Sequence, residues 1–425
     1  MKERIIRLLN ADSEITNYKL NIQNRQSYEL FFVHRDLETV RSTDTTDIKV
    51  TVYVTSEGKL GDASFPVYAS YTDSTIALEI EKAKKRASLA LNPSYPLPEN
   101  ENGEWIANSN FKDYDPRDLA EKIAESVFSA EDDFDGSVNA LEIFIYKDLV
   151  TVINSCGISK SETKYSAMVE AIPTWNGNEE SVELYDCYEF TEFSAENVST
   201  EIAENMKMVR DRLCAKKPEG GIACPVVLES HELDALFHDI ASNLNFSAVY
   251  NHTNAFSKGD SIQKSPTGDK LTLTMKGTMQ GSTGSAIFDG DGCTTKDAKV
   301  ITDGIATDYY GSVRFASYLG ETPTGALNCL AADLGTLSVE ELRSAPYFRC
   351  ASMSGLQVDV YNDYIGGEVR LAYYFDGEKE IPLTGISISG KLSAALSSMR
   401  LSNTETTRGN YNGPSFAALG NIEIV

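Results

Sequence analysis

The stretch PVVLESHELDALFHDIASNLNFSAVYNHTNAFSK, from Pro225 to Lys258, contains three of the four histidines of this 425-residue chain. Within it, apolar residues recur at helical spacing from His231 to Leu244, after a serine, Ser230, that can cap a helix. The apolar residues before that serine indicate a short strand. We therefore predict a strand followed by a helix whose apolar face is buried.

The histidines on this predicted helix are too far apart to share a metal ion. A zinc-protease helix such as H-E-x-x-H places two imidazoles one turn apart, but after His231 that position, 235, is alanine. His238 lies ~10 Å from His231 along a regular helix, whereas both ligands of one zinc ion must lie ~2 Å from it. A regular helix therefore cannot bring these two histidines to one metal.

The frame L-F-H-D-I-A-S-N at residues 236–243, followed by A-F-S at 255–257, resembles the signature helix of a known family. That family is TldD/TldE (PmbA), the "modulators of DNA gyrase". In its TldD branch the helix carries H-E-x-x-x-H, in which two histidines bind zinc and the glutamate activates water. A cysteine close to the C-terminus completes the TldD site.

The resemblance places His238 at the first histidine, Asp239 at the glutamate and Asn243 at the second histidine. Two of the three positions therefore depart from the motif, and no cysteine follows Cys350. This pattern is typical of the TldE (PmbA) branch, whose members resemble TldD in fold, lack its zinc site and work as its partner. The resemblance implies that no metal and no cofactor are bound here.

Further motifs follow the order of the same family. The match covers about 225 to 425 and weakens before it, where LNPSYPLPEN at 91–100 is similar to a family loop. It includes FDGDGCTT at 288–295, ITDGIATDYY at 301–310, ASYLG at 316–320, TPTGA at 322–326, and a tail that ends in GPSF from Gly413.

The composition excludes several classes of partner. The chain has 38 basic and 63 acidic residues and a formal net charge of −25, which disfavours direct binding of nucleic acid or an anionic membrane surface. Apolar runs stay short of the ~20 residues of a membrane span, and the seven cysteines form no C-x-x-C pair. We expect a cytoplasmic protein with reduced thiols.

The remaining pattern predicts an α+β protein of two domains. Polar and apolar residues alternate from Tyr28 to Val67 and from Leu141 to Thr191, which indicates antiparallel strands. The segment KKPEGG, residues 216–221, has the charge, proline and glycine content of a domain boundary. We predict an N-terminal domain of sheet and helices, residues 1–215, and a C-terminal β-rich, barrel-like domain, residues 216–425, which carries the degenerate helix.

Several helices are also predicted from periodicity. The helix at Thr75–Leu91 is expected to turn a basic cluster that includes Lys84 toward solvent. After the signature helix we expect only two more. The full set outside the signature stretch is 1–15, Thr75–Leu91, Pro116–Ser129, Glu196–Ala215, Ser338–Ser344 and Lys391–Met399.

Other candidate sites are weaker. The acidic run at 131–135 lacks the spacing of an EF-hand loop, and GSTGSA at 281–286 lacks the lysine of a phosphate-binding loop. The sequence has no G-x-S-x-G nucleophile elbow. His34 or His252 could pair with a cysteine only through the fold.

The function implied by the resemblance is that of a metal-free partner subunit. Such a subunit forms a heterodimer with a TldD-like zinc peptidase, or a homodimer when made alone, and helps to enclose unfolded peptides. Extended peptides would add main-chain hydrogen bonds to an exposed strand edge.

Two alternatives stay open at the sequence level. One is a self-sufficient metallopeptidase that uses His238 with Asp239, or His231 with Glu232, and the other is a binding or regulatory module without proteolysis. For His238, a pair with Asp234 one turn back and a remnant of an active site are both compatible with the sequence.

Overall fold

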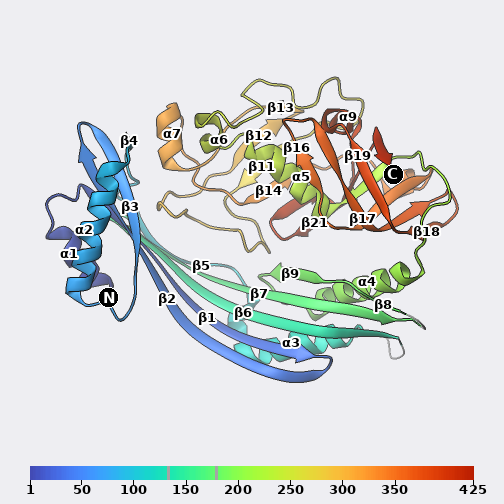
Figure 1. Ribbon diagram of the computed structural model, residues 1–425, viewed down its shortest axis with the longest axis horizontal. Coiled ribbons are helices and arrows are strands. Elements are labelled where there is room, and N and C mark those ends of the chain that lie inside the picture. The colour runs from blue at the N-terminus through green and yellow to red at the C-terminus, as the bar shows by residue number, and fades with distance from the viewer. Residues whose placement is uncertain (132–134, 178–179) are drawn as a thin grey trace.

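The protein, described here by a computed structural model that covers residues 1–131, 135–177 and 180–425, is of the expected α+β class. One long curved sheet forms from strands between residues 17 and 190, and the C-terminal half lies over its concave side (Figure 1). The acidic run considered for calcium includes residues 132–134, which lie outside the described residues. The domain division near residues 216–221 stays a prediction.

The curved sheet is built on four long strands, β1 (Asn17–Val33), β2 (Asp36–Ser56), β6 (Gly136–Asn154) and β7 (Ser159–Asn176). They are longer than the sequence pattern predicted, because polar residues continue the alternation beyond the apolar stretches. The order is β4-β3-β2-β1-β6-β7-β5, with β8 and β9 also on β7. The shorter strands are β3 (Lys59–Val67), β4 (Leu91–Pro93), β5 (Asn102–Ile106), β8 (Ser181–Glu183) and β9 (Asp186–Phe190).

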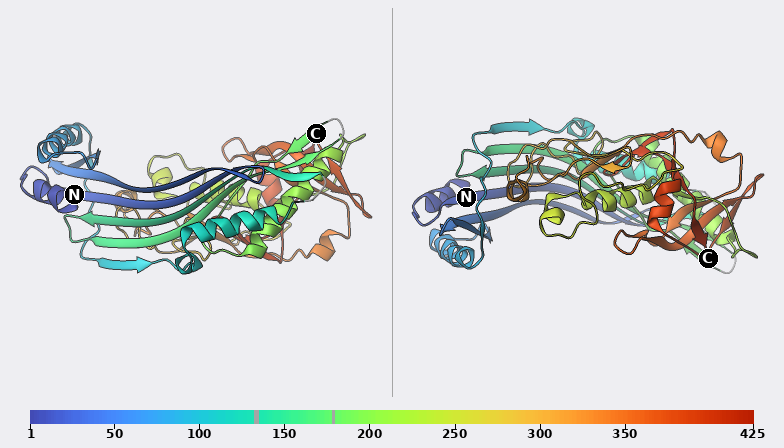
Figure 2. Two further views of the ribbon diagram at one scale, coloured as in Figure 1. Left: turned by 90° about the horizontal axis from the view of Figure 1, so that it is seen from below. Right: turned by 90° about the horizontal axis from the view of Figure 1, so that it is seen from above.

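Two helix pairs cover the two ends of this sheet on one face. Leu20 packs with α1 (Lys2–Asn10) and α2 (Asp73–Leu89), and Leu30 packs with α3 (Pro116–Phe128) and α4 (Ala195–Cys214). Leu20 and Leu30 are an even number of residues apart on β1, so they point to the same face. The opposite face of β1 is thereby left for the C-terminal half, as both views in Figure 2 show.

One residue of α2 does not follow its predicted exposure. Lys84 was expected to face solvent, but it is buried against the end of α1, where its Nζ lies 2.6 Å from Asp12 and 2.7 Å from Glu14 and Glu81. Three carboxylates compensate for the lost hydration of the ammonium group, which explains why a lysine occupies this position.

The C-terminal half contains two sheets, and α5 (Ser230–Ser242) packs against strands of both. The first has the order β20-β23-β10-β15-β17-β19-β24, with β16 and β18 on β17, and the second has the order β13-β12-β11-β14-β22-β21. Their bounds are β10 (Val226–Glu229), β11 (Leu273–Lys276), β12 (Ala298–Thr302), β13 (Ile305–Ala306), β14 (Cys329–Ala332), β15 (Tyr347–Met353), β16 (Gln357–Asp359), β17 (Tyr364–Phe375), β18 (Glu380–Leu383), β19 (Ile386–Gly390), β20 (Arg400–Leu401), β21 (Glu405–Arg408), β22 (Tyr411–Pro414), β23 (Phe416–Leu419) and β24 (Ile422–Ile424).

The expectation of only two helices after the signature stretch is wrong. Besides α8 (Val339–Leu342) and α9 (Leu392–Ser398), the structure has α7 (Val313–Leu319), and α6 (Phe246–Tyr250) lies within the signature stretch. Both unpredicted helices are at most two turns long, too short for apolar periodicity to be visible in the sequence. A short 3₁₀ helix, η1 (Asn110–Asp113), precedes α3.

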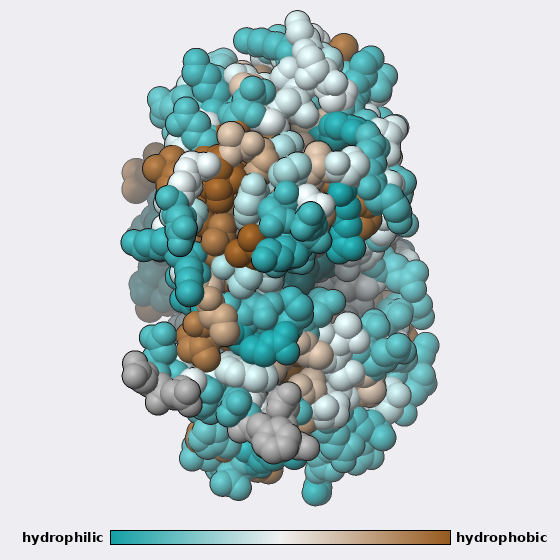
Figure 3. Space-filling view, turned by 90° about the vertical axis from the view of Figure 1, so that its right-hand side faces the viewer, coloured by the Kyte–Doolittle hydropathy of each residue, from teal (hydrophilic) through white to brown (hydrophobic). Residues whose placement is uncertain are grey.

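The surface agrees with the acidic composition. Hydrophilic side chains cover most of the end of the molecule seen in Figure 3, and hydrophobic ones gather in a few patches. None of the described helices combines the length and the apolar character that crossing a membrane requires.

Candidate functional site

The helix that carries the degenerate motif is fixed from its apolar side. Leu233, Phe237 and Ile240 are fully buried among residues of both C-terminal sheets. The helix starts one residue earlier than predicted, because Glu229 takes the N-cap position and Ser230 is already helical. The predicted strand and helix are otherwise confirmed.

His238 is held by two acceptors. Its Nδ1 lies 2.6 Å from Oδ1 of Asp234, one turn back, and its Nε2 lies 3.2 Å from the carbonyl oxygen of Asn328. Burial opposes protonation, but the hydrogen bond and charge of Asp234 outweigh it and raise the pKa of His238 above its usual range. Because a carboxylate and a carbonyl can only accept, the imidazolium form, with two N–H groups, fits both contacts. The predicted pairing with Asp234 is present.

The two other motif positions have different surroundings. Asp239 is exposed on the helix, although partial burial raises the pKa of its carboxyl. Asn243 is buried: its Nδ2 donates to the carbonyl oxygen of Asp239 at 2.9 Å, and its Oδ1 accepts from the backbone N–H of Ala255 at 2.9 Å. Asn243 therefore ties the end of α5 to the polar segment that follows α6.

These donors do not fit a zinc ion. A protein zinc site needs three or four ligands that converge at about 2.0–2.3 Å. Both ring nitrogens of His238 and both polar atoms of the Asn243 side chain already have partners, whereas Asp239 lies on the exposed side. Within residues 1–131, 135–177 and 180–425, no group of three or more His, Cys, Asp or Glu side chains is placed to hold a metal ion.

The two residues of the alternative pair, His231 and Glu232, differ in burial. His231 is exposed at the start of α5, whereas Glu232 is buried and its pKa is raised to about 7, mainly by burial. Glu232 is the third helical residue after the N-cap Glu229, the position from which a glutamate can reach back to the backbone N–H of the N-cap residue. This arrangement gives Glu232 a structural role in starting the helix.

A chain of contacts leads from His238 to the space between the two halves of the molecule. Asn328, which accepts from His238, is followed by the buried Cys329. The Sγ of Cys329 lies 3.3 Å from Oγ of Ser282 and 3.9 Å from Oγ of Ser285. Both serines belong to the predicted glycine-rich loop, so that loop packs on the residue next to the His238 contact.

The same loop forms one wall of a cleft of about 720 Å³, and the concave side of the curved sheet forms the other. On the sheet side, Arg25 makes two hydrogen bonds of 2.8 Å to Asp148 and lies 4.4 Å above the ring of Tyr146. Lys164, on β7 of the sheet, reaches across to the loop and donates to the carbonyl oxygen of Thr283 at 3.1 Å. The cleft therefore has a polar lining with charges of both signs.

One buried carboxyl also lines this cleft. Glu162 on β7 is 5 % exposed, and burial raises the pKa of its carboxyl. Its partner among the described residues is the backbone N–H of Ile287, at a long 3.3 Å. Nothing in the sequence marked Glu162, Arg25 or Asp148, because charged residues at alternating strand positions are usual on a solvated face.

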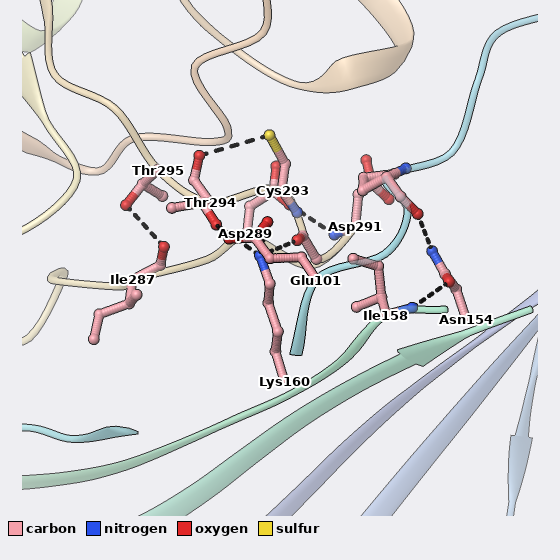
Figure 4. A network of polar contacts seen from close by, with 12 residues as sticks. Glu101, Asn154, Ile158, Lys160, Ile287, Asp289, Asp291, Cys293, Thr294 and Thr295 are labelled. Atoms are coloured by element: carbon pink, nitrogen blue, oxygen red, sulfur yellow. Dashed lines mark hydrogen bonds and ion pairs between the residues drawn. The ribbon is translucent and has the colours of Figure 1, made fainter. Parts of the chain in front are cut away.

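A buried lysine joins the two halves beside the cleft (Figure 4). Lys160 is fully buried, and its Nζ donates to Oε2 of Glu101 at 2.6 Å, to the carbonyl oxygen of Gly292 at 2.9 Å and to Oγ1 of Thr294 at 2.6 Å. Its three donors thus have three acceptors. Nearby, Lys19 forms an ion pair with Asp291.

The turn that receives Lys160 is ordered by Asp289. Its Oδ1 accepts from the backbone N–H groups of Asp291 and Cys293, and its Oδ2 accepts from that of Ala326. The sequence FDGDGCTT, which carried part of the resemblance, therefore forms the turn that contacts the curved sheet.

Residues 221–424 match the family described as PmbA/TldA metallopeptidase C-terminal domain. The C-terminal half of the chain belongs to the TldD/TldE/PmbA family. Solved structures of this family share the fold along the entire chain. TldE from Thermococcus kodakarensis has 16 % identity and a TM-score of 0.79, and the alignment covers 100 % of this chain and 99 % of that one. A search of curated protein sequences found no match.

Two further family structures give the same result. A putative modulator of DNA gyrase from Bacteroides thetaiotaomicron has 15 % identity, a TM-score of 0.80 and coverage of 100 % and 98 % of the two chains. One from Thermotoga maritima has 15 % identity, a TM-score of 0.77 and coverage of 100 % and 99 %. At such identities the likeness concerns the fold, so the TldD/TldE/PmbA fold extends to the N-terminal half, where the sequence resemblance was weak.

Proposed function

We propose that this chain is a metal-free, TldE-like partner subunit of a TldD-type zinc metallopeptidase. The observation that carries the proposal is that the side chains at two of the three aligned positions are already used, because His238 is bound by Asp234 and Asn328, and Asn243 is bound by two backbone groups. A histidine held as imidazolium has no free lone pair for a metal.

The cleft supports a role in holding peptides. Its walls come from both halves of the chain, and backbone and polar groups of residues 278–285 face the sheet across it. An unfolded peptide could be enclosed there, while the TldD-like subunit supplies the bond-breaking chemistry. We place this activity in the cytoplasm, on the strength of the scattered cysteines, odd in number, and the short apolar runs.

The first test is elemental analysis of the purified chain with and without added zinc, together with a peptide-cleavage assay. We expect less than stoichiometric zinc and no cleavage by the chain alone. Stoichiometric zinc that is lost together with activity in His238→Ala would instead identify a self-sufficient metallopeptidase.

The second test is co-purification with a TldD-like protein. The proposal predicts a heterodimer and more cleavage by the pair than by the TldD-like protein alone. Failure to associate, combined with peptide binding by the isolated chain, would support the alternative of a non-proteolytic binding module. A homodimer of the isolated chain that dissociates when the TldD-like protein is added is compatible with the proposal.

A further inference from the structure

The outer half of β2 is an unpaired sheet edge. β1 pairs with β2 along its length, but β3 pairs only with Ile48–Ser56. Within the described chain, Asp36–Asp47 therefore has a strand neighbour on one side alone, and all but Thr43 of these residues are exposed. Figure 1 shows this half of β2 as the outermost strand of the curved sheet.

The direction of the free backbone groups follows from the hairpin between β2 and β3. Ser56 and Lys59 flank a two-residue turn in which Glu57 and Gly58 have φ of 51° and 76°, as in a type I′ hairpin, whose closing pair exchanges both hydrogen bonds. Bonded and non-bonded pairs alternate along an antiparallel strand. The even-numbered residues from Ile48 to Ser56 thus point their backbone N–H and C=O groups toward β3. The even-numbered residues from Val40 to Thr46, which precede the paired part, point these groups to open space.

This edge lacks most of the usual protection against pairing. The segment TVRSTDTTD, Thr39–Asp47, has no lysine, proline or glycine, and its register with β1 is continuous, since the irregularity lies before it, at Phe31/Phe32. Natural sheets block such edges with lysine and other charged side chains, with proline or with bulges, and of these devices Thr39–Asp47 has only the charges of Arg41, Asp44 and Asp47. Nine residues span ~30 Å, and β-branched residues predominate among them, which favours an extended partner.

The charges of the edge indicate the kind of partner. Arg41 is neutralised by its ion pair with Glu29. Among the described residues the exposed acids Asp44 and Asp47 form no ion pair, and Arg25, the cation close to Asp47, is itself paired with Asp148. Asp44 is kept ionised by the amides of Asn24 and Gln26, whose hydrogen bonds lower its pKa. A second copy would bring another acidic edge and a net charge of −25.

We propose that the open edge of β2, Thr39–Asp47, binds an extended, lysine- or arginine-bearing segment of another polypeptide as an added strand. Backbone groups of Val40, Ser42, Asp44 and Thr46 supply the hydrogen bonds, and Asp44 and Asp47 select for basic side chains on the two faces of the sheet. This inference goes beyond the proposed subunit role and does not depend on the absence of a metal.

A cavity beside this edge can receive the side chains of such a segment. It has a volume of about 700 Å³, and Ser42 and Asp44 lie at its edge-strand side. Its charged lining residues are the carboxylates Asp44 and Asp115 and the cations Lys112, Arg117 and Lys147, of which Arg117 is paired with Glu121. The long apolar stems of lysine and arginine can pack on aromatic rings, as in this cavity, whose lining includes Tyr28, Phe111, Tyr114 and Tyr165.

The test uses a nine-residue synthetic peptide in which lysine alternates with valine and threonine. We expect saturable binding to the full chain by isothermal titration calorimetry, weakened about ten-fold or more when glutamate replaces lysine. N-methylation of two consecutive residues in the middle, which blocks both edges of the peptide, should abolish binding. Equal binding of the lysine and N-methylated peptides would overturn the proposal, as would no binding of the lysine peptide.

Matched variants locate the site. Ser42→Pro removes one outward N–H of an edge strand and should lose most of the affinity, whereas Ser42→Ala, which removes the same hydroxyl, should retain it. Asp44→Asn with Asp47→Asn should weaken binding several-fold, and Glu99→Gln with Glu219→Gln, the same charge change elsewhere, should not. If Ser42→Pro does not fold, the N-methylated peptide and the aspartate variants still test the proposal.

A dimer of the free chain that Ser42→Pro disrupts would show that a second copy occupies the edge, and would overturn the proposal.

Discussion

Nζ of Lys160 lies 2.6 Å from Oε2 of Glu101, and the same ammonium group reaches the Gly292–Thr294 turn of the other half of the molecule. This contact holds the C-terminal half on the curved sheet next to the cleft. The lysine is fully buried, whereas the glutamate side chain is 50 % exposed.

The asymmetry in burial predicts unequal costs of removing the two partners. Glu101→Ala leaves a buried, uncompensated ammonium group and should cost about 3 kcal/mol of unfolding free energy. Lys160→Met leaves a half-exposed carboxylate that water can solvate, so its cost should be smaller, about 1–2 kcal/mol. Urea denaturation of both variants checks this. Lys276→Met, which removes an exposed ion pair with Asp297, is the control and should change stability by less than about 1 kcal/mol.

Gly292 in the same turn should not tolerate a side chain. Its φ is +83°, and a Cβ would lie 2.8 Å from Cγ2 of Ile158, in the turn between β6 and β7. Gly292→Ala should therefore cost about 2 kcal/mol or more, from backbone strain and from overlap together. Gly259 has a φ of +92° with no atom near its added Cβ, so Gly259→Ala reports strain alone and should cost about 1 kcal/mol. Equal destabilisation of the two variants by thermal unfolding would show that the overlap contributes nothing.

The pair of His238 and Asp234 predicts a pH dependence. Since the folded pKa of His238 is raised, the pair stabilises the protein below the unfolded pKa of ~6.5, and this stabilisation is lost as pH rises through the folded pKa. Asp234→Asn should therefore destabilise by about 0.5–1 kcal/mol at pH 5.5 and less at pH 9. The direct measurement is an NMR titration of the His238 ring, whose pKa should fall in Asp234→Asn. An unchanged pKa would contradict the role of Asp234.

Strong local patterns in the sequence were reliable guides to the fold. The signature helix and the antiparallel strands between Tyr28 and Val67 could be predicted because apolar periodicity and alternation act within a few residues. The burial of Lys84 and Lys160 could not be predicted from the sequence. Both lysines owe their position to carboxylates, such as Asp12 and Glu101, that only the tertiary fold brings near.

The candidate site, too, has features that the sequence indicated and features that only the tertiary fold shows. Resemblance to the signature motif identified His238, Asp239 and Asn243, but the state of the His238 ring depends on Asn328, far along the chain, and that of Asn243 on the backbone of Ala255. The cleft wall around Arg25 and Asp148 had no sequence signal. The open edge of β2 appears only when the length of β3 is known.

The buried carboxyl of Glu232 gives the last prediction. Its pKa is about 7 in the folded protein, mainly through burial, against ~4.3 for an unperturbed glutamate. The folded state therefore holds a proton that the unfolded state has lost between these pH values, so this group makes the protein less stable as pH rises from about 4.5 to 7.

Glu232→Gln keeps a polar group of the same shape and removes the titration. Relative to wild type, it should be more stable at pH 8 than at pH 5, by a difference of up to about 3 kcal/mol. Chemical denaturation of both proteins at the two pH values measures this difference. Glu99→Gln, a change at an exposed residue, corrects for general charge effects across the same pH range. If the two variants respond alike to pH, then Glu232 is ionised in the folded protein. In that case the N-terminus of α5 stabilises the Glu232 carboxylate by more than burial destabilises it.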